Sequence, residues 1–414
     1  MNVSAFISKK SYASFSGSFT KTIIRISVAA TALSLAVIII AYAVFAGFQS
    51  DISKKVFGFW GHIHITDLSV NRSIEPVPIF VTDSLIRSIK EYDYKLKSSS
   101  SAIENVHPFA IIPGIINKEE ESAGLFFKGL DQRFQWDQFK TYVKEGDVGL
   151  WDSSCIRQIL ISEQTALEHS WKPGDALILN VVSNGEHLKR KLKIAAIYKT
   201  GLEEYDKKFA IIHLDLIREI LNWNQSQATG LEISVRNVAQ AEQISQIIYD
   251  DILPMKYYSE TIRNKFPNIF EWLALQDINK YFILGLVLLV CIINMIVMLL
   301  VLVLERVYLI GVLSSLGMRV SSIRKIFLYY SSYILFWGIL LGNLLGVGFC
   351  LLQKKYKFIR LSEADYYLSH APVSLELWPV LGLNILFFGL IVLVLILPSS
   401  FVAKIKPVES LKFR

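Results

Sequence analysis

The sequence predicts an α-helical membrane protein with four transmembrane helices and a large α+β extracytoplasmic domain between the first two helices. Three observations predict this class. Of the 414 residues, 52% are hydrophobic and only 19% are charged, whereas average soluble domains carry about 25% charged residues. The hydrophobic excess lies in four long runs without Asp, Glu, Lys or Arg. The net charge of +7 is concentrated in the short segments that flank these runs.

Each of the four charge-free runs is long enough to cross a bilayer. They hold 25, 24, 28 and 27 residues, and roughly 20 residues suffice for a helix to cross about 30 Å of hydrocarbon. The spans are expected at residues 26–48, 281–304, 326–353 and 377–403. The first run could instead be a cleaved signal peptide. We expect an uncleaved anchor, because its apolar stretch exceeds the ~7–15 residues of a signal-peptide core.

The basic residues orient the spans. Residues 1–25 carry a net charge of +4, and residues 305–325 and 404–414 carry +3 each, whereas residues 354–376 carry only +1. Because cytoplasmic loops are enriched in Lys and Arg, we expect both termini in the cytoplasm. The N-terminal segment also has the pattern of a basic amphipathic helix on the inner leaflet, with a disordered basic leader as the alternative.

Residues 49–280 are expected to form the extracytoplasmic domain. The net charge between the first two runs is −4, which argues against a nucleic-acid-binding domain. The expected core, residues 55–130 and 227–266, contains both strands and helices and is interrupted by a mostly β insert at residues 131–226. Residues 267–280 are expected to extend the second span as a helical stalk, because a proline suited to the first helical position opens this segment.

Within this domain, alternating apolar residues predict strands, and a period of 3.6 residues predicts helices. The expected strands are residues 62–66, 106–116, 125–130, 176–182, 188–197 and 231–235, and the expected helices are residues 83–96 and 238–250. Asn184-Gly185 between two alternating runs is typical of a tight β-hairpin. The acidic run at residues 118–121 predicts a solvated hairpin tip.

The sequence lacks the motifs of common hydrolases and nucleotide-binding enzymes. It has no G-x-x-x-x-G-K-[ST] phosphate loop, no H-E-x-x-H and no G-x-S-x-G, so we expect a non-catalytic chain without a cofactor of its own. Its three cysteines are expected to be free thiols. His62 and His64 share one face of a strand and could bind a metal. No third ligand is near them in the sequence, so surface or turn histidines are expected.

Glycines recur every four residues in the third span, at Gly338, Gly342 and Gly346. Such a row lets a second helix approach closely. The expected neighbour is a helix of the same subunit or, alternatively, a helix of a second subunit.

The segment between the second and third spans carries an apolar stripe at helical spacing, ended by a glycine. Such a stripe needs a partner, and little soluble chain lies on this side of the membrane to provide one. The segment resembles the motif E-R-x-x-x-I-G-x-L-x-x-L-G of the FtsX-like permease superfamily, whose members dock this coupling helix on an ABC ATPase. The resemblance assigns ATPase docking to Glu305, Arg306, Val307, Ile310, Gly311, Leu313, Leu316, Gly317 and Arg324.

Two positions depart from this motif. Leu309 stands where an acidic residue is common, and Ser314 stands where a basic residue is common. Both members of a possible charged contact with the ATPase are therefore missing.

Other segments resemble the lipoprotein-releasing permeases of the LolC/LolE type within this superfamily. They are residues 6–10, 47–48, 57–63, 128–131, 161–162, 174–175, 200–201 and 204–206, and residues 406–411 match the superfamily's P-x-E-x-L ending. The order of one span, a large outer domain and three further spans is also that of the family. The extended hook by which LolC-type permeases recruit a carrier is replaced here by the tight turn at residues 183–186. This indicates a LolE-like partner or a permease that recruits its carrier differently.

The resemblance implies a permease subunit of an ABC transporter in a bacterial inner membrane. Two permease chains, identical or homologous, would assemble with LolD-like ATPase subunits that bind ATP and Mg²⁺. A lipoprotein would leave the outer leaflet between the first and second spans and pass to a periplasmic carrier, driven by mechanotransmission from the ATPase. The residues expected along its path are Tyr42, Phe45, Gly47, Phe48, Ile283 and Val287. The alternatives are a MacB-type mechanotransmission permease with other cargo and an FtsX-like regulator of a cell-wall hydrolase that transports nothing.

Overall fold

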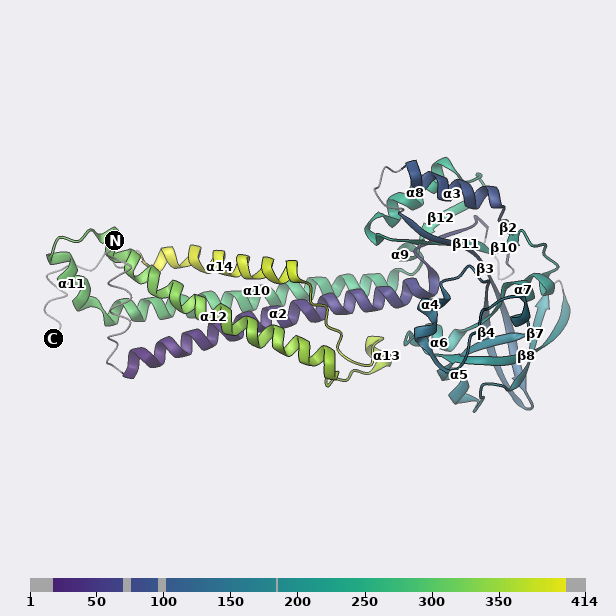
Figure 1. Ribbon diagram of the computed structural model, residues 1–414, viewed down its shortest axis with the longest axis horizontal. Coiled ribbons are helices and arrows are strands. Elements are labelled where there is room, and N and C mark those ends of the chain that lie inside the picture. Colours follow the sequence, from purple (N-terminus) through teal and green to yellow (C-terminus); the bar gives the residue numbers. More distant parts are fainter. Residues whose placement is uncertain (1–17, 70–75, 96–101, 184, 400–414) are drawn as a thin grey trace. The chain divides into compact units, whose positions relative to one another are not determined.

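The computed structural model describes residues 18–69, 76–95, 102–183 and 185–399 (Figure 1). Most of the expected amphipathic N-terminal segment and the whole C-terminal tail lie outside the described residues. The chain divides into two compact units. The first unit holds the described residues up to Ser50, Trp272–Arg360 and the described residues from His370 onward, and the second holds Asp51–Glu271 and Leu361–Ser369.

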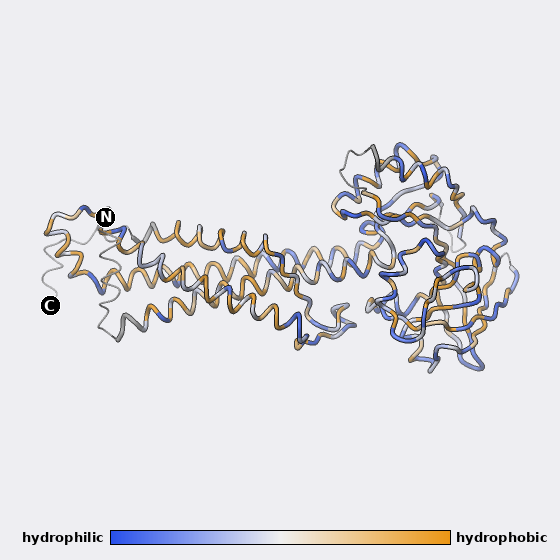
Figure 2. The backbone as a smooth tube through the Cα atoms, viewed as in Figure 1, coloured by the Kyte–Doolittle hydropathy of each residue, from blue (hydrophilic) through white to orange (hydrophobic). Residues whose placement is uncertain are grey.

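Four long helices account for the four predicted spans. They are α2 (Ser18–Trp60), α10 (Pro267–Glu305), α12 (Val320–Tyr356) and α14 (Leu377–Ser399), and the short helix α11 (Val307–Ser315) connects α10 to α12. Figure 2 shows hydrophobic residues along most of the length of these four helices. Helix α10 begins at Pro267, as predicted, because the fixed φ of proline suits the first helical turn.

Helix α10 packs into the first unit through a seam of apolar residues spaced alternately four and three apart. They are Leu284, Leu288, Cys291, Met295, Met298 and Leu302. This spacing keeps the side chains facing the same neighbouring helices, as in a coiled coil. Leu35 of α2, Ile334 of α12 and Phe387 of α14 are buried in the same cluster. All four spans therefore share one apolar core.

The second unit is built on a ten-stranded sheet in the order β12-β1-β11-β3-β4-β9-β6-β8-β5, with β7 paired to β3 and β8. The strands are β1 (Ile63–Asp67), β3 (Ile103–Lys118), β4 (Glu121–Leu130), β5 (Val143–Gly146), β6 (Gln158–Ser162), β7 (Ala176–Ser183), β8 (Glu186–Tyr198), β9 (Phe209–His213), β11 (Gly230–Val235) and β12 (Tyr257–Thr261). A separate pair joins β2 (Ile79–Phe80) to β10 (Gln227–Ala228). The helices of this unit are α3 (Asp83–Lys95), α4 (Trp136–Phe139), α5 (Glu163–Glu168), α6 (Glu203–Lys208), α7 (Leu214–Leu221), α8 (Ala241–Asp251), α9 (Ile262–Lys265) and α13 (Glu363–Tyr366).

Two apolar cores lie within the second unit. One includes Ile63 of β1, Leu231 of β11 and Ile244 of α8. The other includes Phe127 of β4 and Ile217 of α7. Together with the four spans, this architecture confirms the predicted α-helical membrane protein with a large α+β domain.

The division of the domain at residue 131 differs from the observed packing. Val106, near the start of β3, lies in the first core, whereas Ile112 and Phe127 lie in the second core with the expected insert. The reason is the length of β3. Its first part, from Ile103 to Phe109, pairs with β11 of the first core, whereas Ala110–Lys118 pairs with β4 in the second core.

Two local predictions can be compared with the backbone. The β7–β8 hairpin forms as expected, and Gly185 in its loop has φ +79°, a left-handed conformation that glycine adopts without strain. The helix expected at residues 238–250 begins instead with a 3₁₀ turn (Val238–Gln240) before α8. The Asn237 side chain accepts a hydrogen bond from the Ala239 N–H (3.1 Å), as an N-cap does.

Candidate functional site

The C-terminal end of α2 is hydrogen-bonded directly to the sheet of the second unit. Gly61, with φ +70°, ends the helix and donates its N–H to the Phe57 carbonyl (2.8 Å). Glycine at this position avoids the steric penalty that a Cβ atom would carry. The following residue, His62, donates its N–H to the Ile233 carbonyl of β11 (2.8 Å). We call this region the helix junction.

A buried cluster of charged and polar side chains lies at the helix junction. The Glu232 carboxylate is 2.7 Å from the Lys128 Nζ, 3.1 Å from the His64 Nε2 and 3.0 Å from the His107 Nε2. All four side chains are at most 2% exposed. Ion pairs this deeply buried depend on their partners, because an unpaired buried charge is strongly destabilising.

The same cluster holds the end of α2. The Lys128 ammonium donates a hydrogen bond to the Phe59 carbonyl, and the His64 Nε2 lies 2.7 Å from the Trp60 carbonyl oxygen. The last carbonyls of a helix have no partner within the helix and carry its negative dipole end, so a cation is favourable there. Lys128 of β4 thus connects the end of the first span to Glu232 of β11.

Burial and charge pairing together set the protonation states at the helix junction. Burial opposes ionisation of Glu232, but Lys128 and the hydrogen bonds from His107 and His64 hold the pKa of Glu232 below its ordinary value. Burial lowers the pKa of Lys128, and the Glu232 carboxylate opposes this effect. Burial lowers the pKa of His64 to about 4, and the nearby Lys265 adds to the effect. The cluster is therefore a Lys128–Glu232 ion pair with a neutral His64 at neutral pH.

Aromatic rings surround the ion pair. The Lys128 Nζ lies 4.5 Å from the centroid of a Trp60 ring and 4.8 Å from that of Phe59, within the range of a cation–π interaction. Tyr205 stacks on Phe59 at 5.8 Å, and Phe209 meets Trp60 edge-on at 5.1 Å. The helix junction thus brings together three sequence segments that carry the family resemblance, residues 57–63, 128–131 and 204–206.

One expectation needs correction at the helix junction. His64 is fully buried rather than at the surface or in a turn, because its strand is paired on both sides, with β11 and β12, and its ring contacts Glu232. Among the described residues, no group of three His, Cys, Asp or Glu side chains could hold a metal. Glu232 and His107 were not predicted as site residues. A lone glutamate within the apolar strand Gly230–Val235 was the signal that could have indicated a buried charge pair.

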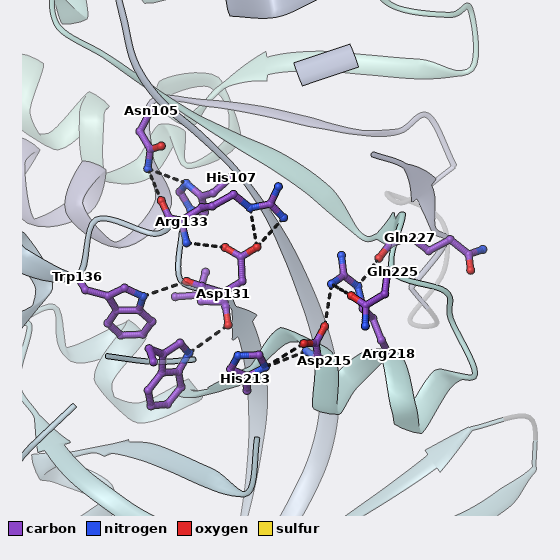
Figure 3. A network of polar contacts seen from close by, with 12 residues as sticks. Asn105, His107, Asp131, Arg133, Trp136, His213, Asp215, Arg218, Gln225 and Gln227 are labelled. Atoms are coloured by element: carbon purple, nitrogen blue, oxygen red, sulfur yellow. Dashed lines mark hydrogen bonds and ion pairs between the residues drawn. The ribbon is translucent and has the colours of Figure 1, made fainter. Parts of the chain in front are cut away.

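A second polar network continues from β4 to α7 (Figure 3). Asp131 forms an ion pair with Arg133 (2.6 Å), and its carbonyl accepts the indole N–H of Trp136 (2.9 Å). Arg218 donates to Asp215 (2.9 Å) and also binds Gln225 and the Gln227 carbonyl. A hollow of about 310 Å³ is lined in part by Asp131, Arg133, Asp215, Arg218 and Gln225. Arg133 and Arg218 are both paired with carboxylates. These contacts stabilise the loop after β4 and connect α7 to the loop that follows it.

The segment Leu361–Ser369, between α12 and α14, belongs to the second unit. The Lys199 ammonium lies 2.8 Å from carboxylate oxygens of both Glu163 and Glu363. The Lys55 ammonium donates to the Tyr367 carbonyl (2.9 Å) from the α2 side. The polypeptide therefore crosses between the two units at α2, at α10 and at both ends of this segment.

The expected docking helix forms as α11, and Gly317, with φ +83°, follows it. The apolar stripe is only partly available to a partner. Ile310 is 1% exposed and packs in the core of the spans, with Leu313 half-buried against the same core. Leu316 is 77% exposed, and Tyr308, which was not assigned, is 62% exposed. The expectation that the whole stripe needs another chain is therefore too broad, because the spans cover Ile310.

The other residues assigned to docking vary in exposure. Gly311 is buried, Val307, Arg306 and Arg324 are half-buried, and Glu305 and Gly317 are exposed. The surface open to a partner thus lies at the two ends of α11 rather than along its middle.

The residues assigned to the lipoprotein path lie on α2 and α10. Tyr42, Phe45, Phe48 and Val287 are half-buried, and Ile283 is 38% exposed. Gly47 is buried, and a Cβ atom there would lie 2.7 Å from the Pro372 carbonyl carbon. The segment that precedes α14 therefore packs directly against Gly47, which contributes no open surface to the expected path.

The glycine row of the third span lies against α2 of the same chain. A Cβ atom on Gly338 would lie 2.7 Å from Thr31, and one on Gly342 would lie 2.9 Å from the Ala32 carbonyl oxygen. A Cβ atom on Gly346 would lie 3.1 Å from the Ala36 Cα. The absence of side chains is what permits this approach of α12 to α2.

The chain is similar to known permeases. Residues 281–407 match the model of the FtsX-like permease C-terminal family. The chain is 19% identical over 412 residues to the lipoprotein-releasing system transmembrane protein LolC of Xylella fastidiosa (strain Temecula1 / ATCC 700964), with 95% of each chain covered. It is 21% identical over 419 residues to the lipoprotein-releasing system transmembrane protein LolE of Haemophilus influenzae, with 94% of each covered. Among solved structures, the periplasmic region of MacB from Actinobacillus actinomycetemcomitans is 12% identical to this chain, with a TM-score of 0.33. The match covers 51% of this chain and 92% of the MacB region.

Proposed function

We propose that this chain, whose residues 281–407 are an FtsX-like permease domain, is the permease subunit of an ABC transporter that releases lipoproteins from the inner membrane. The observation that carries the proposal is similarity over about 95% of the length to LolC and LolE. Similarity of this extent covers the large domain as well as the spans. It therefore supports the specific function more strongly than the C-terminal domain does alone.

The proposed subunit performs no chemistry itself. Extracting acyl chains from lipid costs ~0.8 kcal/mol for each CH₂ group, so the process needs an energy source. A separate ATPase that binds ATP and Mg²⁺ supplies it and docks at α11. A second permease chain, identical or homologous, completes the transporter, and a periplasmic carrier receives the lipoprotein. Both termini then lie in the cytoplasm and the second unit in the periplasm, as the charge distribution predicts.

The helix junction supports a role in mechanotransmission. Transmission of a movement of α2 to the sheet of the second unit requires rigid contacts between them. The Lys128–Glu232 pair provides such a contact, because both charged groups are buried and hydrogen-bonded to each other, and Lys128 also donates to the helix end. We infer that the helix junction passes the motion of the first span to the periplasmic domain, where it displaces the lipoprotein.

Depletion of the chain in its native bacterium tests the proposal. Lipoproteins destined for the outer membrane should accumulate in the inner membrane, as measured by fractionation and immunoblotting, and the wild-type gene supplied in trans should restore their location. Normal lipoprotein location with loss of another exported cargo would favour the MacB-type alternative. Normal lipoprotein location with a defect in cell-wall hydrolysis would favour the FtsX-like regulator.

A further inference from the structure

Four cations cluster at the C-terminal end of α12, a feature that the proposed function does not use. They are Lys354, Lys355, Lys357 and Arg360. All four side chains are exposed, and none of them forms an ion pair with another residue that the structure describes. Their charge is therefore available to a group outside the chain.

Exposed aromatic rings lie among these cations. Tyr356 is 64% exposed and Phe358 is 52% exposed. Phe358 folds back onto the helix, where its ring meets Phe349 edge-on at 5.6 Å. One turn before, Leu351 and Leu352 are each more than half exposed. The apolar surface of the span thus passes directly into a surface of rings and cations, the composition found where a span meets lipid headgroups.

The backbone that carries the cations is fixed. Gln353 is 1% exposed, and its side chain accepts the Ile359 N–H (3.1 Å) and donates to the Ala371 carbonyl (3.0 Å). The Ala371 N–H in turn donates to the Ile359 carbonyl (3.0 Å). Lys357, in the left-handed conformation at φ +49°, ends the helix and donates its N–H to the Gln353 backbone carbonyl (2.8 Å). The cations are therefore held at the end of the span, as in a preformed site.

We propose that residues 354–360 bind the anionic headgroup of a phospholipid whose acyl chains lie along the exposed apolar face of α12. The headgroup phosphate pairs with the lysines and Arg360, and Tyr356 and Phe358 pack at the level of the headgroup. Basic clusters next to a membrane span bind anionic headgroups in this way. The site is independent of the cargo, and it holds for either orientation of the spans.

The test is a titration of the full-length chain in detergent with phosphatidylglycerol or phosphatidylcholine, followed by native mass spectrometry. We expect the wild-type chain to retain phosphatidylglycerol in preference to phosphatidylcholine. Replacing Lys354, Lys355, Lys357 and Arg360 by Gln should weaken phosphatidylglycerol binding by about tenfold or more, given the contribution of each basic residue near an anionic surface. Replacing Lys354, Lys355 and Lys357 by Arg should preserve phosphatidylglycerol binding. The matched control replaces Lys189, Lys191 and Lys193 of β8 by Gln, which removes a similar charge elsewhere and should have no effect.

Three results would overturn the proposal. One is equal binding of the two lipids by the wild-type chain, and another is equal loss of phosphatidylglycerol in the β8 control. The third is complete competition by inorganic phosphate combined with unchanged binding in the Tyr356→Ala/Phe358→Ala variant. That combination would indicate a site for a free anion rather than for a lipid.

Discussion

Lys128 illustrates how burial changes the role of a single charge. A lysine on an exposed strand contributes little to stability, whereas Lys128 is fully buried and neutralises Glu232 while binding the end of α2. The sequence indicated the segment around Lys128 but not its partner. Tertiary packing alone brings Glu232 to Lys128, because the two residues are separated by 104 positions.

Replacing Lys128 by Met should strongly destabilise the chain. The substitution leaves Glu232 buried without its cation, and loss of one member of a buried pair costs about 3–5 kcal/mol in unfolding free energy. Denaturant unfolding of the full-length chain measures this change. Lys189→Met, on the exposed face of β8, is the control, and the double variant Lys128→Met/Glu232→Gln should recover part of the loss. Equal stability of Lys128→Met and the control would contradict the role assigned to the pair.

The stability of the second unit should depend on pH through His64. Burial lowers the pKa of His64 from 6.5 to about 4, so between these values the unfolded chain binds more protons than the folded chain. Stability therefore rises as pH increases from 4 to 6.5 and is fully present above 6.5, with about 3 kcal/mol at stake. Thermal unfolding across this range measures the slope. His64→Gln should reduce the slope, and an unchanged slope would show that His64 does not titrate as stated.

Among the elements, the long helices and the hairpins were the most predictable from the sequence. The charge-free runs predicted the four spans, and Pro267 predicted the start of α10. Alternating residues placed β3, β4, β7 and β8. The part that β3 plays in both cores could not be predicted, because alternation shows that one face of a strand is buried but not which core covers it. The partial burial of α11 was missed for the same reason.

The contact between α12 and α2 predicts unequal effects of two glycine substitutions on one helix. A Cβ atom on Gly342 would lie 2.9 Å from both the Ala32 carbonyl oxygen and the Leu35 Cβ, whereas no atom lies within 4 Å of one on Gly348. Gly342→Ala should therefore destabilise the chain by about 1–3 kcal/mol, and Gly348→Ala should be nearly neutral. Thermal denaturation in detergent compares them. Equal melting temperatures would show that the helices do not pack as described.

The exposed ends of α11 provide a sharper test of ATPase docking than its middle. Leu316→Asp and Tyr308→Asp place a charge on exposed apolar surface and should reduce co-purification of the ATPase by about tenfold or more, while membrane insertion is preserved. Ile310→Asp is unsuitable, because it would bury a charge in the core of the spans. Ser321→Asp, at an exposed position in the first turn of α12, is the control. Undiminished co-purification in both α11 variants would exclude docking at this surface.

At the scale of the whole molecule, the chain combines a four-helix membrane unit with a β-rich unit that it enters and leaves at α2, at α10 and around Leu361–Ser369. The basic segments that orient the spans account for the net charge of +7, and the second unit is slightly acidic. The assignment of the chain to lipoprotein release depends on similarity over about 95% of its length. A transport measurement tests this assignment.

The most direct measurement reconstitutes the chain with its ATPase and second permease subunit in proteoliposomes that contain a labelled triacylated lipoprotein. The proposal predicts ATP-dependent transfer of the lipoprotein to a soluble carrier, with transfer lost when the ATPase is omitted and reduced by Leu316→Asp. ATP hydrolysis that proceeds at its full rate without any lipoprotein transfer would contradict the proposed function.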